Sequence, residues 1–124
     1  MRKSRKNLLA DLGALRREQS RLIRLLSGSQ ELAVGTVAMV RRKCGSPRCR
    51  CATGEGHPQV LFLFTDKHGR RRCKLIRRAD EKKLLRAGER YRNWREALKQ
   101  LRANENRQKK ILLALREERS IHYE

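Results

Sequence analysis

The sequence has few of the residues that build a large apolar core. Only five of its 124 residues are aromatic, and 37% are charged. The longest apolar runs, at residues 60–64 and 111–115, are far shorter than the roughly 20 residues needed to cross a membrane. We therefore expect one small protein without a membrane segment, in which helix pairing and other features besides burial supply the stability that a small core cannot.

Acidic residues are also scarce, since 13 of them face 33 lysines and arginines, a net charge of +20. The excess is uneven, because residues 34–78 hold twelve basic residues against only Glu55 and Asp66, a net +10. Arginine outnumbers lysine 23 to 10, and its planar guanidinium contacts phosphate through paired hydrogen bonds. The sequence therefore favours a polyanionic partner, of which nucleic acid is the commonest.

The first eleven residues are basic at the start but hold no apolar run long enough for a secretory signal. We therefore expect a cytoplasmic protein. Four cysteines could in principle stay free or pair as disulfides, but in a reducing cytosol clustered thiols favour a metal site.

Three of the four cysteines lie in one stretch, residues 44–57, with the spacing Cys-x4-Cys-x-Cys-x5-His. Its glycines and its proline exclude a regular helix or strand and let the backbone fold back on itself. Three thiolates and one imidazole form a common tetrahedral zinc shell. We therefore predict a structural Zn²⁺ site made of Cys44, Cys49, Cys51 and His57.

The segments on either side of this loop are predicted to be β-strands. Residues 36–40 are β-prone and lead to the first ligand. Residues 58–65 and 70–77 are separated by the turn signal Asp66-Lys67-His68-Gly69, which predicts a β-hairpin. The middle of the chain is thus expected to form a three-stranded module.

The fourth cysteine, Cys73, has two interpretations. If Thr65 pairs with Arg70, then Phe62 faces Cys73 across the hairpin, and Cys73 is an ordinary buried cysteine. Alternatively, Cys73 replaces His57 as the fourth metal ligand.

Basic side chains occur at the end of the first strand, in the cysteine loop and in the third strand. We expect them to form one continuous surface that contacts phosphates. These predicted nucleic-acid-binding residues are Arg41, Arg42, Lys43, Arg48, Arg50, Arg70, Arg71, Arg72 and Lys74.

Leucines at heptad spacing predict two long helices, at residues 5–27 and 80–119. The first seam has one polar position and the second is broken at Glu105 and Gln108. The predicted seams are Leu8, Leu12, Leu15, Gln19, Leu22 and Leu26, and Leu84, Ala87, Tyr91, Trp94, Leu98, Leu101, Glu105, Gln108, Leu112 and Leu115.

Both helices join the β module at their near ends, so we expect an antiparallel pair with Leu26 near Leu84 and Leu8 near Leu101. Residues 105–119 would then project beyond the partner helix. The unpaired leucines of this overhang predict a homodimer or a larger protein partner, the alternative being a frayed helix end.

The predicted fold class is therefore α+β: a small zinc-stabilised, three-stranded β module with a hairpin, flanked by two long antiparallel helices of coiled-coil type. The predicted domains are an N-terminal amphipathic helix at residues 1–33, a basic zinc-binding β module at 34–78, and a long helix with a tail at 79–124.

The pattern resembles a family of small bacterial proteins of uncharacterised function that are often encoded near transposases. The shared residues are Gly35-Thr36-Val37, then Cys44-Gly45-Ser46-Pro47-Arg48-Cys49-Arg50-Cys51-Ala52-Thr53-Gly54 with His57. The resemblance covers roughly residues 32–101. It implies a mobile-element context but no particular activity, and it favours His57 over Cys73 as the fourth ligand.

An enzyme is not expected, because the histidines are scattered and a shell of three cysteines and one histidine leaves zinc no open position. The leading hypothesis is a nucleic-acid-binding accessory protein of a mobile element or ribonucleoprotein, with structural zinc and phosphate-contacting arginines, on duplex DNA or structured RNA. The alternative is a protein–protein adaptor whose heptad helices dock on a larger partner such as a transposase.

Overall fold

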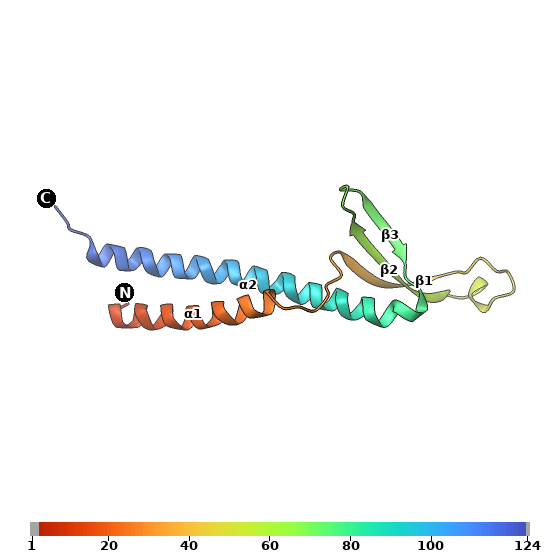
Figure 1. Cartoon of the computed structure of the whole chain (residues 1–124), viewed down its shortest axis with the longest axis horizontal. Helices are drawn as coiled ribbons and strands as arrows, with labels where there is room; N and C mark the ends of the chain where they lie inside the picture. Colours follow the sequence, from red (N-terminus) through yellow and green to blue (C-terminus); the bar gives the residue numbers. More distant parts are fainter. Residues whose placement is uncertain (1–2, 124) are drawn as a thin grey trace. The chain divides into compact units, whose positions relative to one another are not determined.

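This computed structural model describes residues 3–123 and, at Cys51, the backbone alone. Two helices and a three-stranded antiparallel sheet follow one another in the order α1, β1, β2, β3, α2 (Figure 1). The chain divides into two compact units, which we call the helical unit (residues 1–29 and 94–124) and the sheet unit (residues 30–93). The α+β class predicted from the sequence is confirmed.

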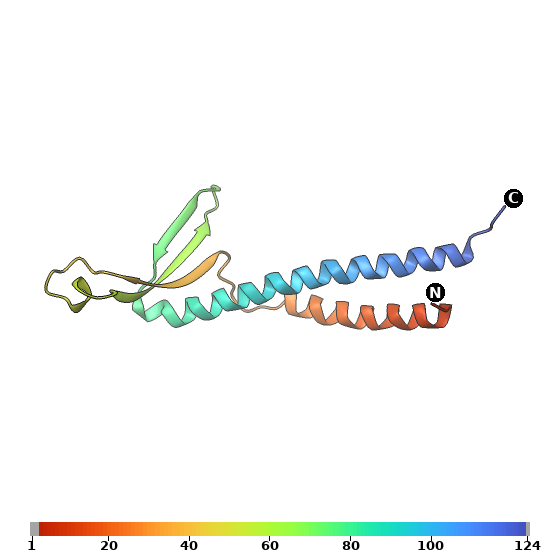
Figure 2. The same ribbon diagram turned by 180° about the vertical axis from the view of Figure 1, so that it is seen from behind.

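The sheet has the order β1-β2-β3, so each strand pairs with its neighbour in sequence. The strands span Thr36–Arg42, His57–Thr65 and Arg71–Leu75. The longest strand, β2, lies in the middle (Figure 2). Its first residue, His57, stands opposite Arg42, the last residue of β1, so the whole cysteine loop leaves from one end of the sheet.

The hairpin turn between β2 and β3 is organised by Asp66. Its carboxylate accepts hydrogen bonds from the backbone N–H groups of His68 (2.9 Å) and Arg70 (3.0 Å), an arrangement typical of turn aspartates. Gly69 adopts a left-handed φ of 78°, and its N–H reaches the Asp66 carbonyl. The Asp66 N–H also bonds to the Arg70 carbonyl, so three residues form the loop and Thr65 pairs with Arg71.

The predicted pairing of Thr65 with Arg70 is therefore wrong by one residue. Because side chains alternate along a strand, this shift moves every β3 side chain to the other face. Cys73 lies opposite Leu63 instead of Phe62 and is exposed, so the prediction of a buried core cysteine is also wrong. Lys74 takes its place opposite Phe62.

The first part of α2, which spans Glu81–Arg119, packs on the sheet within the sheet unit. The Ala33 N–H donates to the Ala87 carbonyl (3.1 Å), and Val60 is only 1% exposed. A Cβ built on Gly88 would lie 2.8 Å from the Val37 side chain, so a glycine is needed where the helix meets β1. The face with Val37, Val60 and Phe62 is thus the covered one, while Leu63 on the other face is 44% exposed.

Helix α1 spans Arg5–Leu26 and begins at Ser4, whose hydroxyl accepts a hydrogen bond from the Asn7 N–H. It ends at Ser27, whose hydroxyl donates to the Ile23 carbonyl at 2.7 Å. Across the described residues, neither helix offers the unbroken apolar length that a bilayer crossing requires.

In the helical unit, α1 and residues 94–119 of α2 run antiparallel, but not in the predicted register. The Trp94 indole N–H donates to the Leu26 carbonyl (3.0 Å), and Arg5 forms an ion pair with Glu118 (3.7 Å). Leu26 therefore lies beside Trp94 instead of Leu84, and Leu115 is 8% exposed. The predicted overhang at residues 105–119 does not exist, because those turns pair with the start of α1.

The reason for this shift is the use of α2 by two partners. Its residues 81–93 are occupied by the sheet and by the connection after α1, where the Arg90 guanidinium donates to the Glu31 carbonyl (2.9 Å). Only the turns from Trp94 onward remain to pair with α1.

The seam predicted for α1 is confirmed, with Leu22 the most buried of its members. In α2 three of the ten predicted seam positions, 98, 105 and 112, are displaced by one residue. Ala97 and Asn104 are buried, whereas their predicted counterparts Leu98 and Glu105 are half-buried and exposed. The side-chain amide of Asn104 donates to the Leu15 carbonyl at 2.8 Å, which fixes this choice.

Candidate metal centre and basic surfaces

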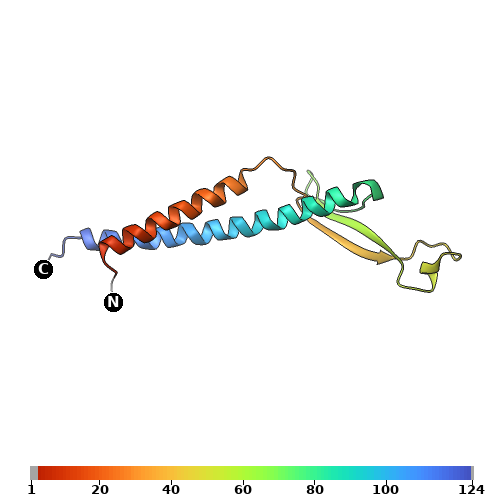
Figure 3. The same ribbon diagram turned by 90° about the horizontal axis from the view of Figure 1, so that it is seen from below.

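The candidate site is the loop of residues 43–56, which joins β1 to β2 and extends beyond the ends of both strands (Figure 3). Cys44 lies two residues after β1. Cys49 immediately precedes a 3-10 turn, η1 (Arg50–Ala52), and His57 is the first residue of β2. The pairing of His57 with Arg42 brings the two ends of the loop together, so ligands from both ends can meet.

Three of the predicted ligands converge. The Cys44 and Cys49 sulfurs and a His57 ring nitrogen all lie within 4.8 Å of one another, and Cys49 Sγ lies 2.9 Å from His57 Nε2. Atoms bound to one tetrahedral zinc stand about 3.5–3.8 Å apart, given zinc–sulfur and zinc–nitrogen bonds of roughly 2.3 and 2.0 Å. Small side-chain movements would bring these three atoms to that spacing, so the prediction that they could share a metal ion is confirmed.

The other two cysteines are Cys51, in the loop, and Cys73, in β3. The backbone of Cys51 lies in η1, two residues after Cys49, but its side chain lies outside the described part of the chain. Cys73 faces Leu63, six residues along β2 from His57, which corresponds to about 20 Å. Cys73 therefore cannot join this cluster, and the alternative in which it replaces His57 is wrong.

The loop has little other than these ligands to hold it. No described side chain between residues 43 and 56 is buried. The backbone supplies short turns, such as the Cys49 N–H to the Ser46 carbonyl (3.2 Å) and the Ala52 N–H to the Cys49 carbonyl (3.1 Å). Such isolated turns are weak in water without buried contacts. A metal shared by both ends would thus be the main link across the loop.

Arg41 closes the base of the loop. Its guanidinium donates to the Gly56 carbonyl (3.3 Å) and forms an ion pair with Glu55 (3.5 Å). The sequence suggested Arg41 only as a phosphate ligand, because the approach of Glu55 depends on how the loop folds back. Arg41 therefore has a structural role in addition to any contact with a partner.

Gly56 is required by this closure, and its replacement tests the site. Its φ is 91°, and a Cβ would lie 2.5 Å from the carbonyl carbon of Arg42. We expect Gly56→Ala to displace His57 and weaken metal binding roughly 5- to 150-fold, because strain of this kind costs about 1–3 kcal/mol. The affinity can be measured with Zn²⁺ in competition with a chromophoric chelator.

Gly54→Ala is the matched control. A Cβ there would meet its nearest atom, the Arg50 carbonyl oxygen, at 3.5 Å, an ordinary contact. It should bind Zn²⁺ like the natural chain. Equal affinities for the two variants would show that the loop closes in another way.

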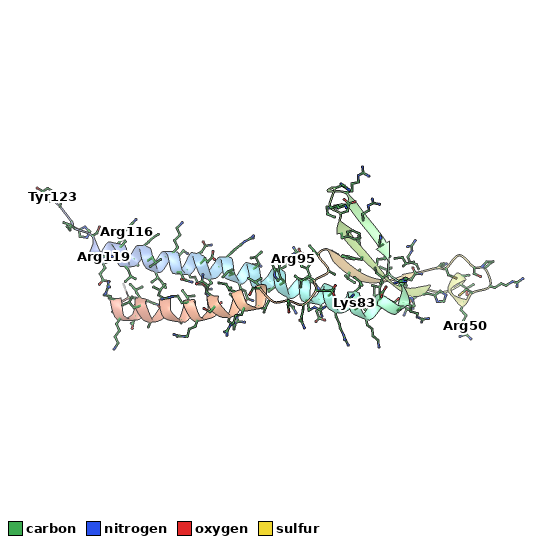
Figure 4. All side chains as sticks on the ribbon, in the orientation of Figure 1. Arg50, Lys83, Arg95, Arg116, Arg119 and Tyr123 are labelled. Atoms are coloured by element: carbon green, nitrogen blue, oxygen red, sulfur yellow. The ribbon has the colours of Figure 1, made fainter. Side chains whose placement is uncertain are left out.

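The nine predicted nucleic-acid-binding side chains are all exposed, but they form two groups instead of one continuous surface. Arg42 and the loop residues lie at the His57 end of β2, and Arg71 pairs with Thr65 at the other end. With nine residues in β2, Arg42 and Arg71 are separated by about 26 Å along the strand, and Lys74, opposite Phe62, lies between these ends. Arg50, in the first group, points away from the loop (Figure 4).

Two members of the predicted set have partners within the chain. One is Arg41, and the other is Arg72, whose guanidinium lies 2.9 Å from Asp66. This hydrogen bond, together with the backbone N–H of Arg70, lowers the pKa of Asp66 below its usual value. Arg72 therefore supports the hairpin turn.

Comparison with known proteins gives one match. A family model described as "Domain of unknown function (DUF6788)" matches residues 14–87, more than half of the chain. The match agrees with the expected likeness to an uncharacterised family. No curated protein and no solved structure matches the chain.

Proposed function

Since the chain belongs to this family of domains of unknown function, we propose a function from its own residues: a nucleic-acid-binding accessory protein whose sheet unit contacts phosphates and whose cysteine loop holds a structural zinc ion. The role beside a mobile element is part of this proposal and rests on the sequence resemblance.

The observation that carries the proposal is a set of exposed cations without internal counter-charges. Seven of the nine predicted side chains form no ion pair with any residue in the described ranges, whereas Arg41 and Arg72 do. In water such groups repel one another, and a polyanion relieves that repulsion. The seven are Arg42, Lys43, Arg48, Arg50, Arg70, Arg71 and Lys74.

The position of the aromatic rings bears on the kind of nucleic acid. The rings of Phe62 and Phe64 are in tilted contact, with centroids 4.8 Å apart and an angle of 42° between their planes, and they share the sheet face that α2 covers with Val60. The open face therefore presents no phenylalanine on which bases could stack, as sheet platforms for single strands require. Two cationic groups toward opposite ends of β2 instead suit the phosphates of a duplex.

For the metal we propose Zn²⁺, held by Cys44, Cys49, His57 and Cys51. The spacing places Cys51 one residue after Arg50, within the same short turn as Cys49. Three thiolates and one imidazole satisfy zinc with no site left for substrate, so the metal would be structural and no catalytic step is proposed. When bound, it would link both ends of the loop and hold Arg48 and Arg50 in place.

Salt dependence tests the binding proposal. With about six phosphate contacts, affinity for a fluorescent 20-base-pair duplex should fall roughly a thousandfold between 50 and 200 mM salt, as measured by anisotropy. The variant Arg70→Ala, Arg71→Ala, Lys74→Ala should weaken binding about tenfold or more and reduce the salt slope by two to three. These three residues are chosen because none holds the hairpin turn as Arg72 does.

The control removes three exposed charges from α2 in the helical unit, as Lys99→Ala, Arg102→Ala, Lys109→Ala. It should change affinity less than about threefold. Binding that does not respond to salt, or an equal loss in both triple variants, would count against a phosphate-contacting sheet unit. Tighter binding to a single strand than to the duplex would contradict the inference from the aromatic rings.

A further inference from the structure

The helical unit contains a second feature that nucleic-acid binding does not use. Two helices cannot bury all of their apolar side chains against each other, and a groove remains along one side of the pair. Two adjoining hollows of about 420 and 550 Å³ form it, and they share Leu8 and Lys3. Leu15 and Ile111 line the first hollow, and Ala114 lines the second.

The groove has the dimensions of a helix-binding site. Its α2 residues run from Arg107 to Glu118, which is roughly 16 Å or three helical turns. Its apolar floor comes from both helices, and it lies open to solvent. An amphipathic helix with apolar residues at positions i, i+3, i+4 and i+7 would fill such a groove.

The charge at the rim selects the kind of partner. Asp11, Glu117 and Glu118 are each paired with a basic residue of the chain. Arg107 and Lys110 form no ion pair with any residue between 3 and 123. The unbalanced charge at the first hollow is therefore positive.

A second copy of the chain fits this rim poorly. The helical unit contains sixteen basic and seven acidic residues, so two copies would repel each other. The apolar side chains of the floor, in turn, provide no positive charge or hydrogen-bond donor for a phosphate backbone. An amphipathic helix with acidic flanks, from another protein, would place apolar side chains on the floor and acidic side chains beside the basic rim.

We propose that this groove binds an amphipathic helix with acidic flanks, supplied by a protein partner. The proposal is independent of nucleic-acid binding, because the groove lies within the helical unit and the predicted phosphate contacts lie in the sheet unit. The protein would then connect a nucleic acid to an acidic protein.

The test uses three synthetic peptides of about 18 residues and the full-length chain at about 150 mM salt. The first has leucines at positions i, i+3, i+4 and i+7 with flanking glutamates, the second is a scrambled sequence of the same composition, and the third has lysines in place of glutamates. Fluorescence anisotropy should show that the first binds at least tenfold more tightly than either of the others.

Variants locate the binding. Arg107→Glu, Lys110→Glu should weaken the acidic peptide at least tenfold, whereas Lys99→Glu, Arg102→Glu, an equal charge change on exposed α2 residues, should have less than a threefold effect. Arg70→Ala, Arg71→Ala, Lys74→Ala should leave peptide binding intact.

Four outcomes would overturn the proposal. The first is equal binding of the scrambled peptide, and the second is preference for the lysine peptide. The third is an equal loss of affinity in the two charge-reversed variants. The fourth is a dimer in sedimentation equilibrium that the groove variant, Arg107→Glu, Lys110→Glu, abolishes. The last would identify a second copy as the occupant. A loss of duplex affinity in the groove variant alone would assign the rim to nucleic acid.

Discussion

Removal of the proposed zinc ion is expected to unfold the cysteine loop and to leave the helical unit intact. Between residues 43 and 56 no described side chain is buried, and the contact of Cys49 Sγ with His57 Nε2 (2.9 Å) lies at the candidate centre itself, so the proposed metal would be the main link across the loop. Structural zinc contributes about 10 kcal/mol or more to the folding of small zinc modules. Chelation should therefore abolish amide protection across the loop in hydrogen exchange, with a loss of at least tenfold.

The helical unit provides an internal reference in the same experiment. Its contacts, such as Trp94 with Leu26 and Arg5 with Glu118, do not involve the loop. Protection at residues 94–119 and the helical signal in circular dichroism should change by less than about a tenth. If the helices unfold together with the loop, the two units do not fold as independently as their separate contacts indicate.

Single ligand variants sharpen this test. Cys44→Ser and His57→Ala should reduce bound zinc, measured by elemental analysis, from about one ion per chain to a small fraction. Cys73→Ser and His68→Ala are the matched controls, since both residues are exposed at or near the hairpin turn, away from the cluster. A folded, metal-free loop in the natural chain, or loss of zinc in Cys73→Ser, would contradict the proposed centre.

The candidate metal cluster was predictable from the sequence because its geometry is local. Cys44, Cys49 and His57 are separated by few residues, and glycines at 45 and 56 provide the left-handed φ values that let the backbone turn back. The pairing of Arg42 with His57 then follows from the two flanking strands. Ligand type and spacing carry enough information in such a case.

The hairpin register was not predictable from the same kind of pattern. Both registers place apolar side chains opposite one another, so the apolar pattern does not separate them. The choice is made by Asp66, whose hydrogen bonds to His68 and Arg70 require a three-residue loop. This turn is a side-chain effect, and it decides which face carries Arg71 and which carries Arg72.

The predicted register of the helix pair was wrong for a related reason. Helix α2 carries two interleaved heptad patterns, one with Ala97 and Asn104 and one with Leu98 and Glu105, and leucine content alone favours the second. From the sequence alone, polar positions such as Glu105 and Gln108 indicate breaks in the seam. In the structure they are the contacts that choose the register, because Gln108 donates to both Gln19 (3.0 Å) and Asn104 (2.6 Å).

Asn104→Ala is accordingly expected to destabilise the helical unit strongly. Asn104 is 1% exposed, and its amide donates to the Leu15 carbonyl while its oxygen accepts from Gln108. Truncation leaves a cavity and removes both the hydrogen bond to the Leu15 carbonyl and one of the two acceptors of the Gln108 amide, which together cost about 2–3 kcal/mol. The thermal midpoint followed at 222 nm should fall by about 10 °C, whereas the exposed neighbour in Asn106→Ala should change it little.

Asn104→Leu separates stability from register. A leucine has no amide group, so the free-energy cost of desolvating that amide on folding is avoided. The thermal midpoint should therefore stay level or rise, as when buried polar groups are replaced by apolar ones. With the polar contact gone, the two heptad patterns of α2 become similar in energy, and the pair should populate more than one register. Trp94 reports this directly, because it is the only tryptophan and its indole N–H bonds to Leu26. One indole resonance in the natural chain and several in Asn104→Leu is the expected NMR result. A single unshifted resonance in the variant would mean that apolar packing alone sets the register.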